Sequence, residues 1–380
     1  MTDRDATPER ILIVSATMGE GHNAAGRALS EAATALWPDV VIEWLDTLDV
    51  MGPGVGPLFR SIYEHNVDGT PWLYQLFYDS LSSRPWFAHG TKRFVGAWAG
   101  RLLGKRLQQI RPDLILSTYP LGSAALEWLR RHRSLPVPVA AWVCDFAPSP
   151  LWVYSDLDLN VVAHDSVEQV ARAQVPGARV AAGGFPVEEA FAPRPRGPAR
   201  SALGLPAQSF VALLSCGSLG FGDLARTAHA LVDAGPQVIT LVVTGHNDSL
   251  RQQLAAEDDR EGRLRVLGWT DDVPGLLTAS DLVVTNAGGS TAMEALACGR
   301  AVIMHRPIAG HGRANASLMA AAGLADVTED EEQLTSTIRR LHQEPALVER
   351  REQQALAAAE RQRLGDVLAR LAERALHEVA

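Results

Sequence analysis

The chain has 380 residues, of which 47% are apolar and 21% charged, so it is long enough for two globular domains and is not an intrinsically disordered protein. A formal net charge of -9 argues against a broad nucleic-acid-binding surface, which would be basic. The three cysteines have neither zinc-ligand nor disulfide spacing, which suits a reducing cytosol, and we expect them to be small core residues: Cys144, Cys216 and Cys298.

The sequence contains no candidate for a membrane-spanning helix. No apolar run reaches the ~20 residues that such a helix needs, and the polar residues 1–10 lack the apolar core of a signal peptide. We therefore expect a cytoplasmic protein, whose contact with a membrane would be peripheral and on the inner face.

The first half begins with a strand, a glycine-rich turn and a helix. Residues 11–15 have the pattern of a buried strand, the turn follows at residues 19–24, and a helix is predicted over 23–36 before a second strand at 40–46. This β–α–β start is typical of doubly wound folds, which bind ligands beyond the carboxyl ends of their strands. His22 lies at that edge, either packing at the helix start or acting as a general base.

Residues 47–106 interrupt the alternation of strands and helices. Aromatic and aliphatic residues are mixed there with arginine and lysine. One interpretation is a group of helices packed on the sheet, with most of the aromatic side chains in the core. The alternative is an apolar surface with a basic rim that docks on anionic lipid. Glycine and proline at residues 52–57 predict that the region starts as a loop.

The alternation then returns, with strands at residues 114–117, 137–143 and 159–163 and helices at 123–132 and 166–173. Asp145 follows the strand 137–143, on the same sheet edge as His22. It is either the cap of a turn or a carboxylate near an acceptor. The pair Asp156 and Asp158 has D-x-D spacing, but nothing nearby completes a set of metal ligands, so we predict no metal site there.

The second half repeats this plan after a segment rich in proline and glycine at residues 183–198. Strands are predicted at residues 210–215, 238–244, 264–267, 282–284 and 301–304, and helices at 223–234, 249–257, 275–279, 331–341 and 345–379, with a break near Gly365. Two such α/β domains, facing each other across a cleft, would bring two substrates together.

Residues 280–315 carry the strongest local pattern of the second half. The buried strand 282–284 leads into Gly288-Gly289, and Ser290 or Thr291 can cap the helix that follows. Free N–H groups and the helix dipole would make this helix start a phosphate site.

Glu294 lies three residues after Thr291 and has two interpretations. It is either the carboxylate of a capping box, bonded back to the start of its own helix, or it binds the two ribose hydroxyls of a nucleotide. The spacing alone does not choose between them.

With these residues in view, the chain resembles the GT-B glycosyltransferases. It is most similar to the group that contains monogalactosyldiacylglycerol synthases, processive diacylglycerol glucosyltransferases and the peptidoglycan GlcNAc transferase. The resemblance rests on Gly21-His22-x-x-Ala25, on residues 116–120 and 143–146 with Trp152, and on residues 286–296 followed by Pro307-Ile308-Ala309-Gly310 and Asn315. It spans nearly the whole chain.

The resemblance implies an α/β fold of two Rossmann-like doubly wound domains. The acceptor-binding domain would comprise residues 1–190 and the nucleotide-sugar-binding domain residues 191–355. The segment 356–380 would be a C-terminal helix that packs back on the first domain.

The resemblance also implies a UDP-sugar in the second domain and no cofactor or metal. Residues 269–273 would hold the base, Glu294 the ribose, and the glycine turns the diphosphate. The implied donor-binding residues are Gly21, Gly217, Ser218, Leu219, Trp269, Thr270, Val273, Gly288, Gly289, Ser290, Thr291, Glu294, His311 and Gly312.

The implied reaction is direct displacement with inversion at the anomeric carbon. His22 would deprotonate the acceptor hydroxyl, with Asp145 as the second catalytic residue, and a helix dipole would stabilise the leaving diphosphate. By family analogy the acceptor would be a membrane lipid or lipid-linked molecule, received by residues 47–106 at the cytoplasmic face.

The sequence departs from the family pattern after Pro-x-x-Gly. The family usually continues with Gln-Glu, which contacts the sugar hydroxyls, whereas this chain has Gly310-His311-Gly312-Arg313. A neutral His311 can donate one hydrogen bond and Gly312 has no side chain, so the family's sugar preference is not transferred to this chain.

Three other functions remain as alternatives. The same fold could glycosylate a soluble small molecule such as a natural product, or the chain could be a sugar-nucleotide epimerase, although few carboxylates and histidines are available for that chemistry. The departure at residues 310–313 is also compatible with a binding module that has no catalytic activity.

Overall fold

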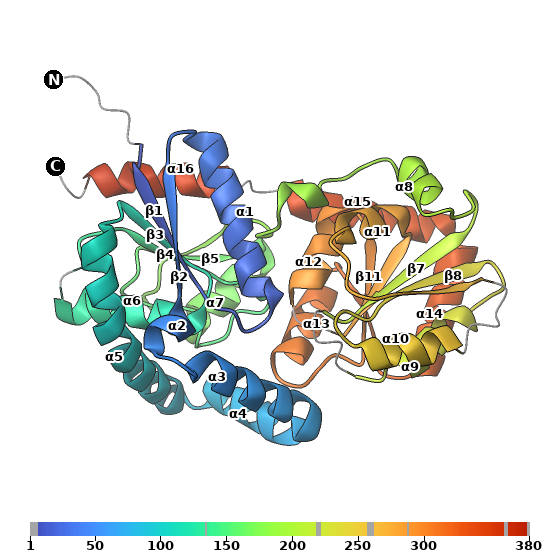
Figure 1. Cartoon of the computed structure of the whole chain (residues 1–380), viewed down its shortest axis with the longest axis horizontal. Helices are drawn as coiled ribbons and strands as arrows, with labels where there is room; N and C mark the ends of the chain where they lie inside the picture. The colour runs from blue at the N-terminus through green and yellow to red at the C-terminus, as the bar shows by residue number, and fades with distance from the viewer. Residues whose placement is uncertain are drawn as a thin grey trace. The chain divides into compact units, whose positions relative to one another are not determined.

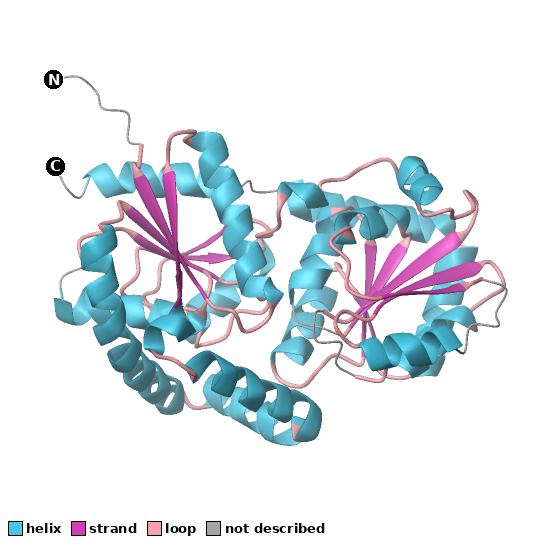
Figure 2. Ribbon diagram, viewed as in Figure 1, coloured by secondary structure: helices cyan, strands magenta, loops and turns pink. Residues whose placement is uncertain are grey.

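The computed structural model describes residues 7–133, 135–217, 222–256, 262–286, 289–360 and 364–377. They belong to two compact units, one made of Met1–Glu189 with Arg361–Ala380 and the other of Ala190–Glu360. Each unit has its own six-stranded parallel sheet with helices on both faces (Figures 1 and 2). The prediction of an α/β protein with two doubly wound, Rossmann-like domains is therefore confirmed.

The sheet of the first unit has the order β2-β1-β3-β4-β5-β6. Its strands are β1 (Arg10–Ser15), β2 (Val41–Asp46), β3 (Leu114–Ser117), β4 (Val139–Trp142), β5 (Leu159–Val162) and β6 (Val180–Ala182). Its helices are α1 (Glu20–Leu36), α2 (Thr47–Met51), α3 (Val55–Glu64), α4 (Pro71–Ser83), α5 (Pro85–Ile110), α6 (Pro120–Arg133), α7 (Glu168–Gln174) and α16 (Leu364–His377), with a π-helical turn at His65–Gly69 and a 3-10 turn at Asp165–Val167.

Alternate residues of β1 enter the cores on the two faces of this sheet, as the side-chain period of a strand requires. Ile11 and Ile13 pack in a core with residues of α1 and α16, whereas Leu12 and Val14 pack in a second core with residues of α5 and α6. Helix α16 lies against α1, so the C-terminal helix belongs to the first unit (Figure 1).

The sheet of the second unit has the order β12-β11-β10-β7-β8-β9. Its strands are β7 (Phe210–Ser215), β8 (Val238–Val243), β9 (Leu264–Leu267), β10 (Leu282–Thr285), β11 (Ala301–His305) and β12 (Asp326–Thr328). Its helices are α8 (Arg196–Ala202), α9 (Leu224–Val232), α10 (Asp248–Ala256), α11 (Val273–Ala279), α12 (Gly289–Ala297), α13 (His311–Ala321), α14 (Glu331–Gln343) and α15 (Pro345–Glu360), with a 3-10 turn at Glu189–Phe191.

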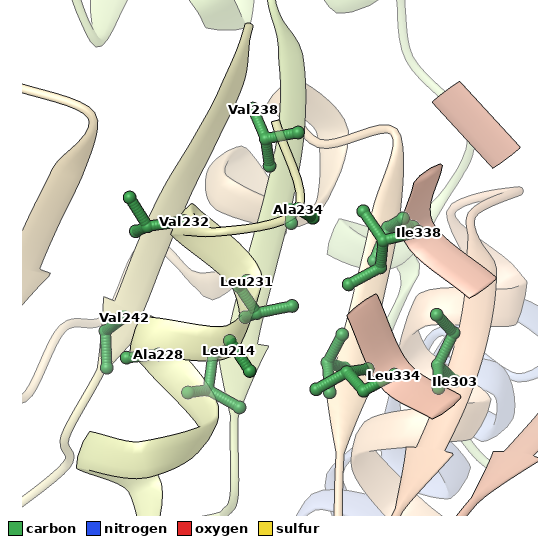
Figure 3. Close-up of a cluster of buried hydrophobic side chains, with 14 of the residues drawn as sticks. Leu214, Ala228, Leu231, Val232, Ala234, Val238, Val242, Ile303, Leu334 and Ile338 are labelled. Carbon is green, nitrogen blue, oxygen red and sulfur yellow. The ribbon is translucent and has the colours of Figure 1, made fainter. Parts of the chain in front are cut away.

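One core of the second unit lies between its sheet and the helices α9 and α14. Figure 3 shows Leu231 of α9, Leu334 and Ile338 of α14, and Leu214 of β7 pointing into the same cluster. Every one of these side chains is at most 1% exposed. Each fully buried aliphatic side chain contributes ~1.5–3 kcal/mol to the free energy of folding. This core therefore stabilises the sheet that carries the glycine-rich turns.

The region 47–106 is helical almost throughout, forming α2, α3, α4 and α5. The expected loop is confined to residues 52–54. The interpretation that most of its aromatic side chains are core residues is wrong for five that are exposed: Trp72, Phe77, Trp86, Phe94 and Trp98. The aliphatic side chains of Leu58, Ile62, Leu73 and Leu76 are exposed as well. The spacing of these residues predicts helices, but an apolar helical stripe does not reveal whether protein or solvent lies beside it.

Helix α1 begins at Glu20, three residues earlier than predicted, so Gly21 and His22 belong to its first turn. Asp46, at the end of β2, accepts hydrogen bonds from Leu48 N and Thr17 N and caps α2. The three cysteines are buried, as expected. Within the described residues, no helix combines the length and hydrophobicity needed to cross a membrane.

Candidate functional site

In each sheet, successive strands of the chain are added first on one side and then on the other side of a switch point. Ligands of open α/β folds bind at such a switch point. In the first unit the switch point lies between β1 and β3, because β2 extends the sheet on one side and β4 on the other. In the second unit it lies between β7 and β10. The predicted site residues His22 and Gly289 lie in the first turns of α1 and α12, the helices that follow two of these strands, β1 and β10.

His22 is held by the residue that follows β3. Its Nδ1 lies 2.9 Å from the backbone carbonyl oxygen of Thr118. Since a carbonyl oxygen only accepts, Nδ1 must carry the proton, and Nε2 is then the basic nitrogen of the neutral ring. The His22 ring packs edge-on against Tyr119, with centroids 5.0 Å apart, and against Trp152 at 5.6 Å.

Trp152 links the two predicted catalytic residues. Its ring contacts His22, and its Nε1–H donates a hydrogen bond of 3.1 Å to Oδ2 of Asp145. The indole is only 5% exposed. A buried donor fixes the orientation of the carboxylate, so the structure brings His22 and Asp145 to one place through a residue that the sequence had marked only by family resemblance.

Three tyrosines from the helical region 47–106 are electrostatically coupled to Asp145. Burial raises the pKa of Tyr63, Tyr74 and Tyr78 above the usual value, and the Asp145 carboxylate adds to the rise in each case. These phenols therefore remain protonated at neutral pH and can serve as hydrogen-bond donors. Sequence reasoning missed them, because tyrosines in an apolar helix resemble ordinary core residues.

Helix α12 starts directly beyond β10 with Gly289, Ser290 and Thr291. Ala292 and Leu296 are buried, whereas Ser290, Thr291 and Glu294 are partly exposed. Glu294 is thus in the second turn of a helix whose N-terminal end faces the carboxyl edge of the sheet. The predicted residues Ser218, Leu219 and Gly288 lie outside the described residues, so their roles stay predictions.

Gly217 follows β7, the strand that pairs with β10, and has a positive φ of 74°. Residues other than glycine rarely adopt that conformation, so a glycine is favoured at this turn beside the start of α12.

Trp269 stacks on His246, with ring centroids 4.2 Å apart and an angle of 9° between the planes. Trp269 follows β9, His246 follows the neighbouring strand β8, and the indole is 48% exposed. Thr270 accepts a hydrogen bond from Asp272 N, and Val273 begins α11. The stacked pair therefore presents a flat aromatic surface at the sheet edge. The sequence analysis did not predict His246 as a site residue, although its position beyond the carboxyl end of β8 is typical of ligand-binding residues in such sheets.

The departure at residues 310–313 forms the start of α13. Gly310 has a positive φ of 69° and His311 is the first residue of the helix. A Cβ on Gly312 would lie 2.5 Å from Cγ1 of Ile308, closer than atoms can pack. A larger side chain at this position would therefore require Ile308 to move. Gly312 offers its backbone N–H, but no side chain, to a ligand.

Within the described parts of the chain, no cluster of three or more histidine, cysteine, aspartate or glutamate side chains is arranged to hold a metal ion. The two aspartates of the D-x-D sequence form ion pairs: Asp158 with Arg130 and Asp156 with Arg131.

The exposed apolar side chains of α3, α4 and α5 define what we call the apolar surface of the first unit. It consists of Leu58, Ile62, Trp72, Leu73, Leu76, Phe77, Trp86, Phe94 and Trp98. Trp86 and Phe94 are 71% and 72% exposed. Exposed basic residues lie on or beside the same helices: Arg84, Arg93, Lys105 and Arg106. A surface of this kind marks an interaction site.

Two family models match the two halves of the chain. Residues 22–187 match the model described as monogalactosyldiacylglycerol (MGDG) synthase, and residues 211–368 match the glycosyltransferase family 28 C-terminal domain. The first match covers His22, Asp145 and the apolar surface. The second covers the sheet edge with Trp269 and Glu294.

Curated relatives cover most of the chain. The processive diacylglycerol beta-glucosyltransferase of Bacillus subtilis (strain 168) is 26% identical over 343 residues, which are 87% of this chain and 86% of that protein. The protein of the same description in Bacillus cytotoxicus is 25% identical over 335 residues, 86% of this chain and 83% of its own length.

Solved structures share the fold. Acinetobacter baumannii MurG has a TM-score of 0.55 at 17% identity, covering 96% of this chain and 99% of its own. Anabaena HepE in complex with UDP-glucose also has a TM-score of 0.55 at 17% identity, covering 97% and 99%. The calicheamicin glycosyltransferase CalG4 has a TM-score of 0.61 at 16% identity, covering 98% and 99%.

Proposed function

We propose that this chain, a GT-B glycosyltransferase of the group that contains monogalactosyldiacylglycerol synthases and processive diacylglycerol glucosyltransferases, transfers a hexose from a UDP-sugar to a hydroxyl of a diacylglycerol-type lipid. Transfer proceeds with inversion at the cytoplasmic face of the membrane and requires no metal. The observation that carries the proposal is the orientation of His22 by Thr118, beside a Trp152 that also binds Asp145.

The acceptor is activated by His22. With Nδ1–H donated to the Thr118 carbonyl, Nε2 accepts the proton of the acceptor hydroxyl as the acceptor oxygen attacks the anomeric carbon. The C–O bond to the diphosphate breaks, and UDP leaves with the bonding electron pair. Asp145 stabilises the imidazolium ion or orients the acceptor, and the protonated phenols of Tyr63, Tyr74 and Tyr78 can donate to an acceptor oxygen.

The donor is bound by the second unit. The exposed Trp269 on His246 offers a stacking surface for uracil. The start of α12, at Gly289 and Ser290, offers N–H groups and a positive dipole end for the diphosphate, and these stabilise the negative charge that develops on the leaving group. Glu294, one turn further along α12, would bind the ribose hydroxyls. The complex of Anabaena HepE with UDP-glucose supports a UDP-sugar donor on this fold.

The lipid acceptor is favoured over a soluble one by the apolar surface of the first unit. Trp86 and Phe94 are among the most exposed large apolar side chains of the described residues, and exposed arginines accompany them. Interfacial tryptophan and phenylalanine with basic residues are typical of proteins that lie on anionic membranes. The names of the curated relatives also point to diacylglycerol.

The proposal is tested by product analysis. The full chain is incubated with UDP-glucose, UDP-galactose or UDP-GlcNAc and with vesicles that contain diacylglycerol, and products are identified by mass spectrometry and NMR. We expect a glycosyl-diacylglycerol with the β configuration from an α-linked donor. A product with retained configuration would contradict inversion, and transfer to soluble alcohols with none to diacylglycerol would establish the natural-product alternative.

A further inference from the structure

A cavity of about 340 Å³ lies between α5 and α6. It is open to solvent at the side of the first unit and is lined by a majority of basic and imidazole side chains: His89, Lys92, Arg93, Ala97, Ala124, Glu127, Trp128, Arg131 and His132. We call it the α5–α6 pocket. Its volume is in the range of sites that hold small molecules or headgroups.

The close crossing of the two helices creates this pocket. A Cβ on Gly96 would lie 2.6 Å from the carbonyl oxygen of Ala124, and a Cβ on Gly100 would lie 2.6 Å from the Trp128 ring. The glycines therefore allow α5 to touch α6 there, and Ala97 and Trp128 line the adjoining pocket.

Two side chains of the lining, those of Arg93 and His89, form no hydrogen bond or ion pair with the described residues. Lys92 uses its ammonium on the carbonyl oxygen of Val153 and lies 4.4 Å from the centroid of the Tyr154 ring. Burial lowers the pKa of Lys92 to about 8, because the charged ammonium is less well solvated inside the protein than in water. An ammonium has three N–H donors, which leaves it capacity for an anionic ligand.

Glu127 is the acidic residue of the lining, and it is already paired. Its Oε1 accepts from Arg131 at 3.3 Å, and Arg131 also binds Asp156. The remaining charge of the lining is positive, from Lys92 and Arg93. An anion in the pocket would thus meet the guanidinium of Arg93 beside the ammonium of Lys92, whose charge Glu127 balances in part.

We infer that the α5–α6 pocket binds a phosphate ester, as the headgroup of an anionic lipid or as a soluble phosphate. The planar guanidinium of Arg93 matches the geometry of phosphate oxygens, and Lys92 supplies a second positive charge in the lining. Trp128 forms an apolar wall suited to the carbon atoms of the ester. Neither Asp145 nor His22 lines this pocket, so it is a second site.

The surroundings of the pocket favour the lipid source. Successive residues of a helix point about 100° apart, so Phe94 and Trp98 project from the faces next to Arg93 and Ala97. Both are part of the apolar surface. A lipid whose acyl chains lie along that surface would have its phosphate at the mouth of the pocket.

The test compares three variants of the full chain on vesicles of phosphatidylcholine, with and without phosphatidylglycerol. Ala97→Phe fills the pocket without a change of charge. The double variant His89→Gln/Arg93→Gln removes the positive charge of Arg93 and the imidazole of His89, and leaves the partly buried Lys92 intact. The control Lys105→Gln/Arg106→Gln removes two exposed positive charges from the same helix outside the pocket.

We expect the first two variants to bind phosphatidylglycerol vesicles at least about tenfold more weakly than the control, although the control removes more formal charge. Calorimetry with sn-glycerol 3-phosphate and with inorganic phosphate identifies the source. Heat of binding that Ala97→Phe abolishes indicates a soluble phosphate ester, and vesicle binding that depends on the pocket without such heat indicates a lipid headgroup.

Two results would overturn the inference. One is that Ala97→Phe binds the anionic vesicles as well as the unmodified chain does, while no soluble phosphate binds. The other is that soluble phosphate binds equally well to the chain with the filled pocket. Each measurement records binding rather than sugar transfer, so neither outcome depends on the proposed reaction.

Discussion

The imidazole of His22, in the first turn of α1, donates its Nδ1–H to the backbone carbonyl of Thr118, which directly follows β3, over 2.9 Å. The two residues are 96 positions apart in the chain, and the parallel pairing of β1 with β3 brings them together. The switch point of the first sheet therefore determines which nitrogen of His22 is basic, and the proposed role in catalysis follows from that.

Trp152 couples His22 to Asp145, and its replacement should slow transfer. Trp152→Phe keeps an aromatic ring beside His22 but removes the Nε1–H that binds Asp145. A hydrogen bond to a charged group contributes ~1.5–3 kcal/mol, so kcat/KM should fall about tenfold to a hundredfold. Steady-state kinetics with diacylglycerol vesicles measures this.

A double-mutant cycle provides the control for that prediction. If Trp152 acts through Asp145, then Asp145→Asn combined with Trp152→Phe should be hardly worse than the more damaging single variant. Strictly additive losses would mean that the indole and the carboxylate act separately.

Stacking of Trp269 on His246 should determine the affinity for the nucleotide. Trp269→Ala removes the exposed ring, and loss of one stacking partner costs ~1–3 kcal/mol, so UDP should bind about fivefold to a hundredfold more weakly. His246→Phe keeps a stacked aromatic ring beneath Trp269 and should retain most of the affinity, whereas His246→Ala should not.

Calorimetric titration with UDP checks these values. Trp98→Ala, which removes an exposed indole from the first unit, serves as the control and should leave UDP binding unchanged. Equal affinity of Trp269→Ala and the unmodified chain would exclude the stacked pair from the nucleotide site.

The apolar surface should control binding to membranes. Trp86→Ser combined with Phe94→Ser removes two of its most exposed side chains and should lower vesicle binding strongly. Each Å² of apolar surface that these side chains bury in the membrane interface contributes ~25 cal/mol to the free energy of binding. Trp269→Ser is a matched control, because it removes an exposed indole elsewhere. Identical co-sedimentation of the unmodified chain, the double variant and Trp269→Ser with diacylglycerol vesicles would rule out membrane docking by α5.

Gly312 should be required for packing at the start of α13. Gly312→Ala places a Cβ against Ile308 and should lower the free energy of unfolding by ~1–3 kcal/mol, as overpacking does. Ile308→Ala in the same chain makes room and should recover part of that loss. Gly197→Ala is the control, since no atom lies within 4 Å of the added Cβ, and it should be neutral or stabilising. Thermal unfolding of these three variants and of the unmodified chain gives the differences in stability.

The sequence was sufficient to locate both sheet edges, because buried strands are short apolar runs and glycine turns follow them. That placed His22, Asp145 and Glu294 at strand ends. It could not reveal the stack of His246 on Trp269, which depends on the pairing of β8 with β9. The contact of Gly312 with Ile308 was hidden for the same reason, since it depends on the close packing at the start of α13.

The apolar surface shows a different limit of sequence reasoning. The spacing of Leu73, Leu76 and Phe77 predicts one face of a helix, and α4 has that face. Whether the face is covered by protein is decided by the position of α4 relative to α5, which no local pattern encodes. The three side chains are in fact exposed.

The most direct measurement of the central claim is transfer by His22→Ala alongside its UDP affinity. We expect kcat for glycosylation of diacylglycerol to fall about 100- to 10,000-fold, because a general base contributes that much, while UDP affinity stays unchanged. Thermal unfolding of the same variant confirms that it is folded. Transfer at the rate of the unmodified chain would contradict the account of His22 as the base.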